Sequence, residues 1–177
     1  MLAIIRNDHI NMKRLLKILT NKIVLLEKDE TVDFRLVKTI ITYLRHYADR
    51  FHHPMEDLIW AYYRKHYRVS SDIAARLPLE HKRVKQATIE LDELLEMILL
   101  DAIVPKEQCI EKLKYFVALQ SAHMAYEEEQ ILPLIEESLS DNDWENIRQQ
   151  WQYNEYKDPL FGESVADQYR KLATYLK

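Results

Sequence analysis

Histidine and carboxylate side chains are spaced in this chain so that they could hold a metal ion. His123 and Glu127 stand four residues apart in a segment with helical periodicity, which puts them on one face of a helix. The same face carries Leu113, Phe116 and Met124, so both polar side chains fall within an apolar stripe. Burying an imidazole or a carboxylate without a partner costs several kcal/mol. A metal ion satisfies both groups at once, so the pair predicts a metal site.

A second helix offers two alternative pairs with the same spacing, His52 with Glu56 and His53 with Asp57. A helical-wheel count places His52 roughly 80° from the centre of the apolar stripe and His53 roughly opposite it. Pro54 can rotate the residues that follow, because proline disrupts the regular hydrogen bonding of a helix. We favour His52 and Glu56 and keep His53 in reserve.

Two further histidines are expected at the same level. His9 and His81 each lie roughly 70° from the centre of their apolar stripes, near the starts of the first and third helices. In an antiparallel bundle these two helices run in the same direction, so both imidazoles meet His52 and His123 at one end. Four histidines and two carboxylates exceed the needs of a tetrahedral zinc ion and suit two metal ions.

The elements that position these residues are predicted to be helices. The chain has 177 residues, one glycine and five prolines, too few turn glycines for a sheet protein of this length. We predict an all-α, antiparallel up-down-up-down four-helix bundle over residues 1–140, with additional C-terminal helices in an extension over residues 141–177. The expected helices span approximately residues 3–28, 32–67, 78–102, 105–137, 141–151 and 163–175. Pro78 is expected to open the third helix, and residues 158–162 are expected to form a turn.

Composition limits the partners and the compartment. The net charge of −4 offers no basic surface for nucleic acid. Cys109 is the only cysteine, so an intrachain disulfide is impossible and a reducing compartment is expected. No apolar run is long enough to span a membrane. We therefore expect a cytoplasmic protein, with the last helix either capping the bundle or forming a homodimer contact.

Four short segments in this order resemble the hemerythrin-like, or HHE cation-binding, domain family. They are residues 7–12, 49–60, 79–83 and 123–133, and the turn at 158–162 is similar to that of bacterial members. The resemblance covers roughly residues 1–140. It implies that the imidazole ligands and bridging carboxylates of the family correspond to His9, His52 (or His53), His81, His123, Glu56 and Glu127.

One departure from the family pattern concerns the third helix. Oxygen-carrying hemerythrin has a second histidine one turn after the ligand on that helix, where this chain has Lys85 after His81. The resemblance then implies one imidazole fewer, which weighs against reversible oxygen carriage. We expect a non-haem protein with two iron ions in a carboxylate-bridged centre that binds or senses oxygen, nitric oxide, peroxide or iron itself. The alternatives are an oxidase or peroxidase-like di-iron enzyme, and a helical interaction module with a structural metal.

Overall fold

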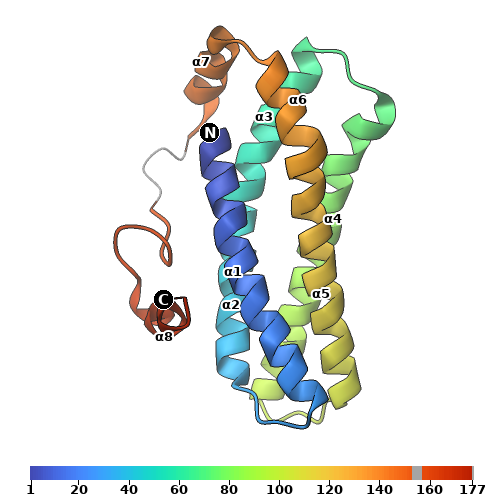
Figure 1. The fold of residues 1–177 in the computed structure, drawn as a ribbon, viewed down its shortest axis with the longest axis vertical. Helices are drawn as coiled ribbons and strands as arrows, with labels where there is room; N and C mark the ends of the chain where they lie inside the picture. The colour runs from blue at the N-terminus through green and yellow to red at the C-terminus, as the bar shows by residue number, and fades with distance from the viewer. Residues whose placement is uncertain (153–156, 177) are drawn as a thin grey trace.

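The computed structural model describes residues 1–152 and 157–176, and within them every regular element is a helix. This confirms the all-α prediction. Figure 1 shows long helical rods lying side by side, with the C-terminal segment to one side of them. The rods are formed by α1 (Leu2–Glu27), α2 (Phe34–Tyr47), η1 (Ala48–His52), α3 (His53–His66), α4 (Ser71–Leu99), α5 (Lys106–Tyr126), η2 (Glu127–Ile131) and α6 (Leu132–Ser138). Helix α2 packs against α4, and α5 packs against both α1 and α4.

Two of the rods contain a π-helical segment. The five residues of η1 join α2 to α3, and the five residues of η2 join α5 to α6. A π-helical turn holds more residues than an α-helical turn, so the angular position of every later side chain changes. The predicted single helices over 32–67 and 105–137 are therefore continuous rods whose register shifts part-way along.

The interior consists of two apolar clusters with buried polar residues between them. In α1, Ile5 belongs to one cluster and Met12 to the other, and His9 lies between them in the sequence. In the rod formed by α5, η2 and α6, Met124 belongs to the first of these clusters with Met12 and Ile131 to the second with Ile5, and Glu127 lies between them in the sequence. The predicted histidines and carboxylates thus occupy a polar layer inside an otherwise apolar core.

Aspartate takes the place of glycine at two helix ends. Asp29 and Asp101 both have a φ of 59°, the left-handed conformation that often ends a helix. The backbone N–H groups that follow them, of Glu30 and Ala102, donate to the carbonyls of Leu25 and Met97. These ends explain how helices can be closed in a chain with a single glycine.

Helix α4 begins earlier than predicted. Ser70 caps it by accepting a hydrogen bond from the N–H of Ile73, so Pro78 lies inside the helix and does not open it. Proline has no N–H to donate to the carbonyl four residues earlier, that of Ala74. The indole N–H of Trp60 donates to this carbonyl instead, at 3.4 Å. The replacement donor comes from α3, and it allows the helix to continue through the proline.

The C-terminal segment matches the prediction only in part. Helix α7 (Asp141–Gln150) forms as expected and has a capping box between Ser140 and Asp143. The predicted helix over 163–175 is reduced to η3 (Asp167–Tyr169) and α8 (Arg170–Thr174). The division of the chain at residue 140 stays a prediction, and residues 153–156 and 177 of the proposed extension lie outside the described residues.

The turn at 158–162 accounts for the shortened last helix. The side-chain carboxylate of Asp158 accepts hydrogen bonds from the backbone N–H groups of Leu160 and Phe161. The backbone carbonyl of Asp158 accepts a hydrogen bond from the N–H of Gly162. A Cβ on Gly162 would lie 2.3 Å from that carbonyl oxygen, so the position requires glycine. Further along, the N–H of Ala166 donates back to the carbonyl of Pro159. These backbone groups are engaged in the turn and are not available to a helix.

No helix among the described residues has the length and apolar character needed to cross a lipid bilayer.

Candidate metal centre

All the histidines and carboxylates proposed as metal ligands are buried, and they converge at one level of the bundle. They come from α1, η1, α3, α4, α5 and η2. None has more than 7% of its surface exposed, although imidazoles and carboxylates are rarely buried so deeply unless they are paired. These residues are His9, His52, His53, Glu56, His81, His123 and Glu127.

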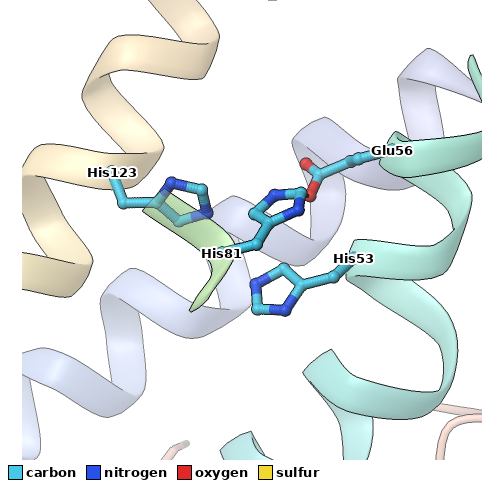
Figure 2. Close-up of side chains that lie close together, drawn as sticks. All are labelled: His53, Glu56, His81 and His123. Atoms are coloured by element: carbon cyan, nitrogen blue, oxygen red, sulfur yellow. The ribbon is translucent and has the colours of Figure 1, made fainter. Parts of the chain in front are cut away.

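One group of possible ligands contains three imidazoles. Figure 2 shows the side chains of His53, Glu56, His81 and His123 extending toward a common centre. One ligand atom from each residue lies within 4.8 Å of all the others. The His53 and His81 rings stack with their centroids 4.3 Å apart. Nitrogen and oxygen atoms this close together can surround a single cation.

A second group shares one residue with the first. His9, His52, Glu56 and Glu127 also offer ligand atoms within 4.8 Å of one another. Glu56 belongs to both groups, so its carboxylate lies between two possible cation positions. The structure therefore contains two adjacent groups of possible ligands.

Both carboxylates extend between the two groups. Glu56 places Oε1 3.4 Å from Nε2 of His52 and Oε2 3.4 Å from Nε2 of His81. Glu127 places Oε2 3.3 Å from Nε2 of His9, and Oε1 3.2 Å from Nε2 of His123. Each carboxylate thus directs one oxygen toward each group, as a bridging ligand between two ions would.

Several of these buried atoms have no hydrogen-bond partner. They are Nε2 of His9, His52, His53 and His123, both carboxylate oxygens of Glu56, and Oε2 of Glu127. An unsatisfied buried polar atom costs about 1–3 kcal/mol, so a group of them is a strongly unfavourable arrangement for the protein alone. One cation in each group would satisfy all of these atoms. The residues present therefore fit a metal centre.

Comparison with known protein families agrees with this geometry. The chain matches the family described as the hemerythrin HHE cation binding domain over residues 1–135. It belongs to this family. No curated protein and no solved structure was found to match the chain.

The imidazoles of this hemerythrin-family centre differ in their affinity for protons. Burial lowers the pKa of His53 well below its usual value, and the neighbouring ring of His81 adds to the effect. Burial also acts to lower the pKa of His9, but the nearby carboxylates of Glu127 and Glu56 outweigh it and raise the pKa to about 10. The pKa of His81 rises to about 11, because the carboxylates of Asp57, Glu127 and Glu56 likewise outweigh burial. Cations that bind here must displace these protons.

The carboxyl group of Glu56 remains ionised in this environment. Burial alone would raise its pKa, but the imidazoles of His52, His81 and His9 hold the pKa well below its usual value. An ionised carboxylate is the form that binds metal ions.

Four other carboxylates lie within hydrogen-bonding distance of the Nδ1 atoms of four of these imidazoles. We refer to Asp8, Asp57, Glu80 and Glu128 as the outer carboxylates. Their oxygens lie 3.2 Å from Nδ1 of His52, 2.9 Å from Nδ1 of His81, 3.4 Å from Nδ1 of His123 and 2.8 Å from Nδ1 of His9, respectively. A carboxylate on Nδ1 keeps the proton there and leaves the Nε2 lone pair directed at the metal position.

The outer carboxylates form a closed ring around the bundle. Asp8 of α1 binds the imidazole of η1, and Asp57 of α3 binds that of α4. Glu80 of α4 accepts a hydrogen bond from His123 of α5, and Glu128 of η2 accepts one from His9 of α1, which closes the ring. Each rod thus orients an imidazole of the next rod in chain order. Every outer carboxylate is also the sequence neighbour of a proposed ligand, a signal that was available in the sequence.

The helical-wheel position of His53 is wrong, because its side chain is buried like that of His52. Both rings lie in the centre, one in each group of possible ligands. Asp57, the alternative carboxylate, accepts from His81 and has a side chain that is 54% exposed, so it lies outside both groups. The helical-wheel count fails because η1 ends at His52, and the π-helical turn brings consecutive residues to the interior.

The expectation of one imidazole fewer than in oxygen-carrying hemerythrin stays a prediction. Lys85 lies on the outside of α4, where its ammonium group is 3.3 Å from the carboxylate of Asp49. The imidazole of His53 lies in the same group of possible ligands as that of His81, so the two groups together contain five imidazoles.

Proposed function

We propose that the protein binds two iron ions in a carboxylate-bridged centre and uses them to bind or sense a small ligand. His53, His81 and His123 would hold one ion, and His9 and His52 the other. Glu56 and Glu127 would each give one oxygen to each ion. The observation that supports this most directly is that two four-residue groups of possible ligands share Glu56.

The donor set favours iron over a structural zinc ion. Structural zinc is usually bound by four ligands, often with cysteine among them, whereas Cys109 is buried with the apolar core cluster and belongs to neither group of possible ligands. Imidazole and carboxylate ligands together suit iron, and carboxylate-bridged pairs of iron ions occur in helical bundles. We propose that the surrounding fold is the antiparallel up-down-up-down bundle expected from the sequence.

The donors would leave room for an added ligand. Three imidazoles and two carboxylate oxygens make five donors for one ion, and two imidazoles and two oxygens make four for the other. Six-coordinate ions would therefore keep open positions. Bound iron supplies reversible one-electron chemistry and these open positions.

A small apolar cavity lies beside both bridging carboxylates. Its volume is about 10 Å³, measured as the space open to the centre of a water-sized sphere. It is lined by Glu56, Glu127 and apolar side chains, namely Leu2, Ile5, Ile59, Leu77, Ile131, Leu132 and Ile135. A cavity of this size holds about one water molecule. It would admit a diatomic ligand or peroxide and exclude larger molecules.

The ligands that we propose are oxygen, nitric oxide, peroxide or iron itself. The apolar wall would limit the access of water, and the two bridging carboxylates would hold the ions at a fixed separation. We further propose a cytoplasmic protein without nucleic acid or membrane partners, which could form a homodimer through its C-terminal segment.

Iron loading tests this proposal. Protein loaded with ferrous iron without oxygen and then desalted should retain two iron ions per chain by elemental analysis. Air or nitric oxide should then produce near-ultraviolet charge-transfer bands. Each group should bind one ion. The proposal is contradicted if the protein retains fewer than about one iron per chain. Sustained peroxide consumption with a reductant would instead support the related enzyme function.

A further inference from the structure

The outer carboxylates differ in their surroundings, although each accepts a hydrogen bond from an imidazole. Asp8 is buried with 7% of its side chain exposed, whereas 54% of the Asp57 side chain is exposed to solvent. Both hydrogen-bond an imidazole Nδ1, at 3.2 Å and 2.9 Å. The two aspartates therefore make the same contact in different dielectric environments.

The remaining partners of the outer carboxylates also differ. Glu80 accepts a hydrogen bond from Arg76 at 2.6 Å, and Glu128 lies 3.8 Å from the guanidinium group of Arg6. The second oxygen of Asp8 accepts from the neutral hydroxyl of Tyr47 at 2.9 Å. Among residues 1–152 and 157–176, no lysine or arginine forms an ion pair with Asp8. Asp8 thus lacks the cationic partner that Glu80 and Glu128 have, and its side chain is much less exposed to water than that of Asp57.

A negative charge at this position acts on the metal through His52. The Nδ1–H of the imidazole donates to Asp8, which increases the electron density that Nε2 can offer to a metal ion. A ferric ion carries one more positive charge than a ferrous ion, so it gains more from this donation and from the charge itself. Interactions between charges are stronger at a buried position such as that of Asp8, whose side chain is 7% exposed, than at an exposed one such as that of Asp57.

On the basis of the proposed di-iron function, we infer that the outer carboxylates are positioning residues that lower the reduction potential of the centre, and that Asp8 has the largest effect. The closed ring of carboxylate–imidazole pairs around the bundle carries this inference. A centre held toward its oxidised state suits a protein that responds to oxidants. It is less suited to one that carries oxygen reversibly, which requires the reduced ions to be stable.

The test is a redox titration of the iron-loaded protein and of charge-removing variants, followed optically. Asp8→Asn keeps the size of the side chain and can still accept from His52. It should shift the ratio of oxidised to reduced iron at a fixed potential at least tenfold toward the reduced form. That ratio corresponds to a rise in midpoint potential of about 59 mV for a one-electron couple.

Matched variants separate charge from structural damage. Asp57→Asn removes the same charge from an exposed site and should raise the potential less than Asp8→Asn does. Glu129→Gln alters an exposed neighbour of Glu128 and should leave the potential unchanged. If Asp8→Asn loses its iron, Tyr47→Phe serves in its place. Without the Tyr47 hydroxyl the Asp8 charge is less neutralised, so the potential should fall.

The outcomes distinguish this inference from the proposed function. If the unmodified protein retains no iron, the di-iron function fails, and the inference fails with it. If the protein and Asp8→Asn both retain two iron ions but have equal potentials, the inference alone is overturned. A larger shift for Asp57→Asn than for Asp8→Asn would also overturn it, because buried charge would then not be the cause.

Discussion

His52 and His53 are consecutive residues, yet their rings lie in different groups of possible metal ligands. Their ring centroids are 5.7 Å apart, and both side chains are buried. His52 lies with His9, and His53 lies with His81 and His123. A constant angle of about 100° per residue places His53 roughly opposite the apolar stripe of its helix. The π-helical turn at 48–52 changes that angle, and His53 is buried together with His52.

Replacing His53 should remove one ion and leave the other. His53→Ala deletes an imidazole from the three-imidazole group, so iron content should fall from two toward one per chain, or the affinity for the second ion should fall at least tenfold. Elemental analysis after dialysis against a weak chelator measures this. His46→Ala is the matched control, because His46 is exposed on α2. Two tightly bound ions in His53→Ala would assign no ligand role to His53.

The metal centre shows where sequence reasoning succeeds and where it does not. The four-residue spacing of His123 and Glu127 predicted their burial, because both precede the π-helical shift or lie at its first residue. The same count favoured His52, which is buried, but failed at His53, which follows such a shift. A helical wheel assumes a constant angle per residue, and Pro54 indicated that the angle could change but not where or by how much.

The hydrogen bond from Trp60 to Ala74 should stabilise the fold because Pro78 cannot supply the usual donor. Trp60→Phe removes the indole N–H and should lower the free energy of unfolding by about 1–3 kcal/mol. In a Pro78→Ala background the backbone N–H at residue 78 can donate to Ala74 instead. The cost of Trp60→Phe should then be smaller by about 1 kcal/mol. Urea unfolding of the four proteins measures the coupling, and equal costs in both backgrounds would contradict it.

Filling the apolar cavity should slow ligand binding without removing iron. Ile135→Phe adds volume to the cavity wall, so nitric oxide should bind the loaded protein at least tenfold more slowly in stopped-flow measurements. Ile147→Phe is the control, because Ile147 belongs to the same apolar cluster but does not line the cavity. Both substitutions should cost about 1–3 kcal/mol of stability. Equal binding rates for the two variants would argue against entry through this cavity.

Asp92 should make the contact between α2 and α4 sensitive to acid. Burial acts to raise its pKa, but Lys38, Arg45 and Thr42 outweigh burial and lower it. The stabilisation is therefore fully present above the unfolded pKa of about 3.9 and is lost as the pH falls through the lower folded value. Asp92→Asn should cost about 1.5–3 kcal/mol at pH 7 and progressively less below pH 4.

Urea unfolding at several pH values measures the effect of Asp92→Asn. The control is Glu145→Gln, which removes an exposed carboxylate paired with Arg148 and should give no measurable pH-dependent difference. A cost for Asp92→Asn that is the same at pH 7 and in strong acid would contradict the assignment.

Removing the metal should destabilise the protein, because the buried nitrogens and oxygens that held it would again lack a partner. Iron at about 100 times the dissociation constant of each site should raise the free energy of unfolding by about 2.7 kcal/mol per bound ion through mass action. Thermal unfolding with and without iron measures this, and the chelator alone, added to metal-free protein, is the control. An unchanged melting temperature would favour a helical interaction module whose structure does not depend on metal.

The C-terminal region shows a second limit of prediction from sequence. The helix expected over 141–151 is present, and its capping box is formed by two residues close in sequence, Ser140 and Asp143. The helix expected over 163–175 is shortened, because the turn that starts at Asp158 engages the backbone as far as Ala166. Tyr43 of α2 donates to Asp158 at 2.8 Å, so a contact distant in sequence helps hold that turn. Periodicity within a segment does not reveal such contacts.

The surroundings of Asp8 connect the metal centre to the part of the chain beyond the family match. Asp8 lines an open pocket of about 390 Å³ together with Arg148, Trp151, Asp158 and Phe161, all of which follow residue 135. A trimmed domain that ended at residue 135 would keep all seven proposed ligands but lose this wall. Asp8, which hydrogen-bonds the imidazole of His52, would then be more exposed to water. Its charge would be more strongly screened, although every proposed ligand was still present.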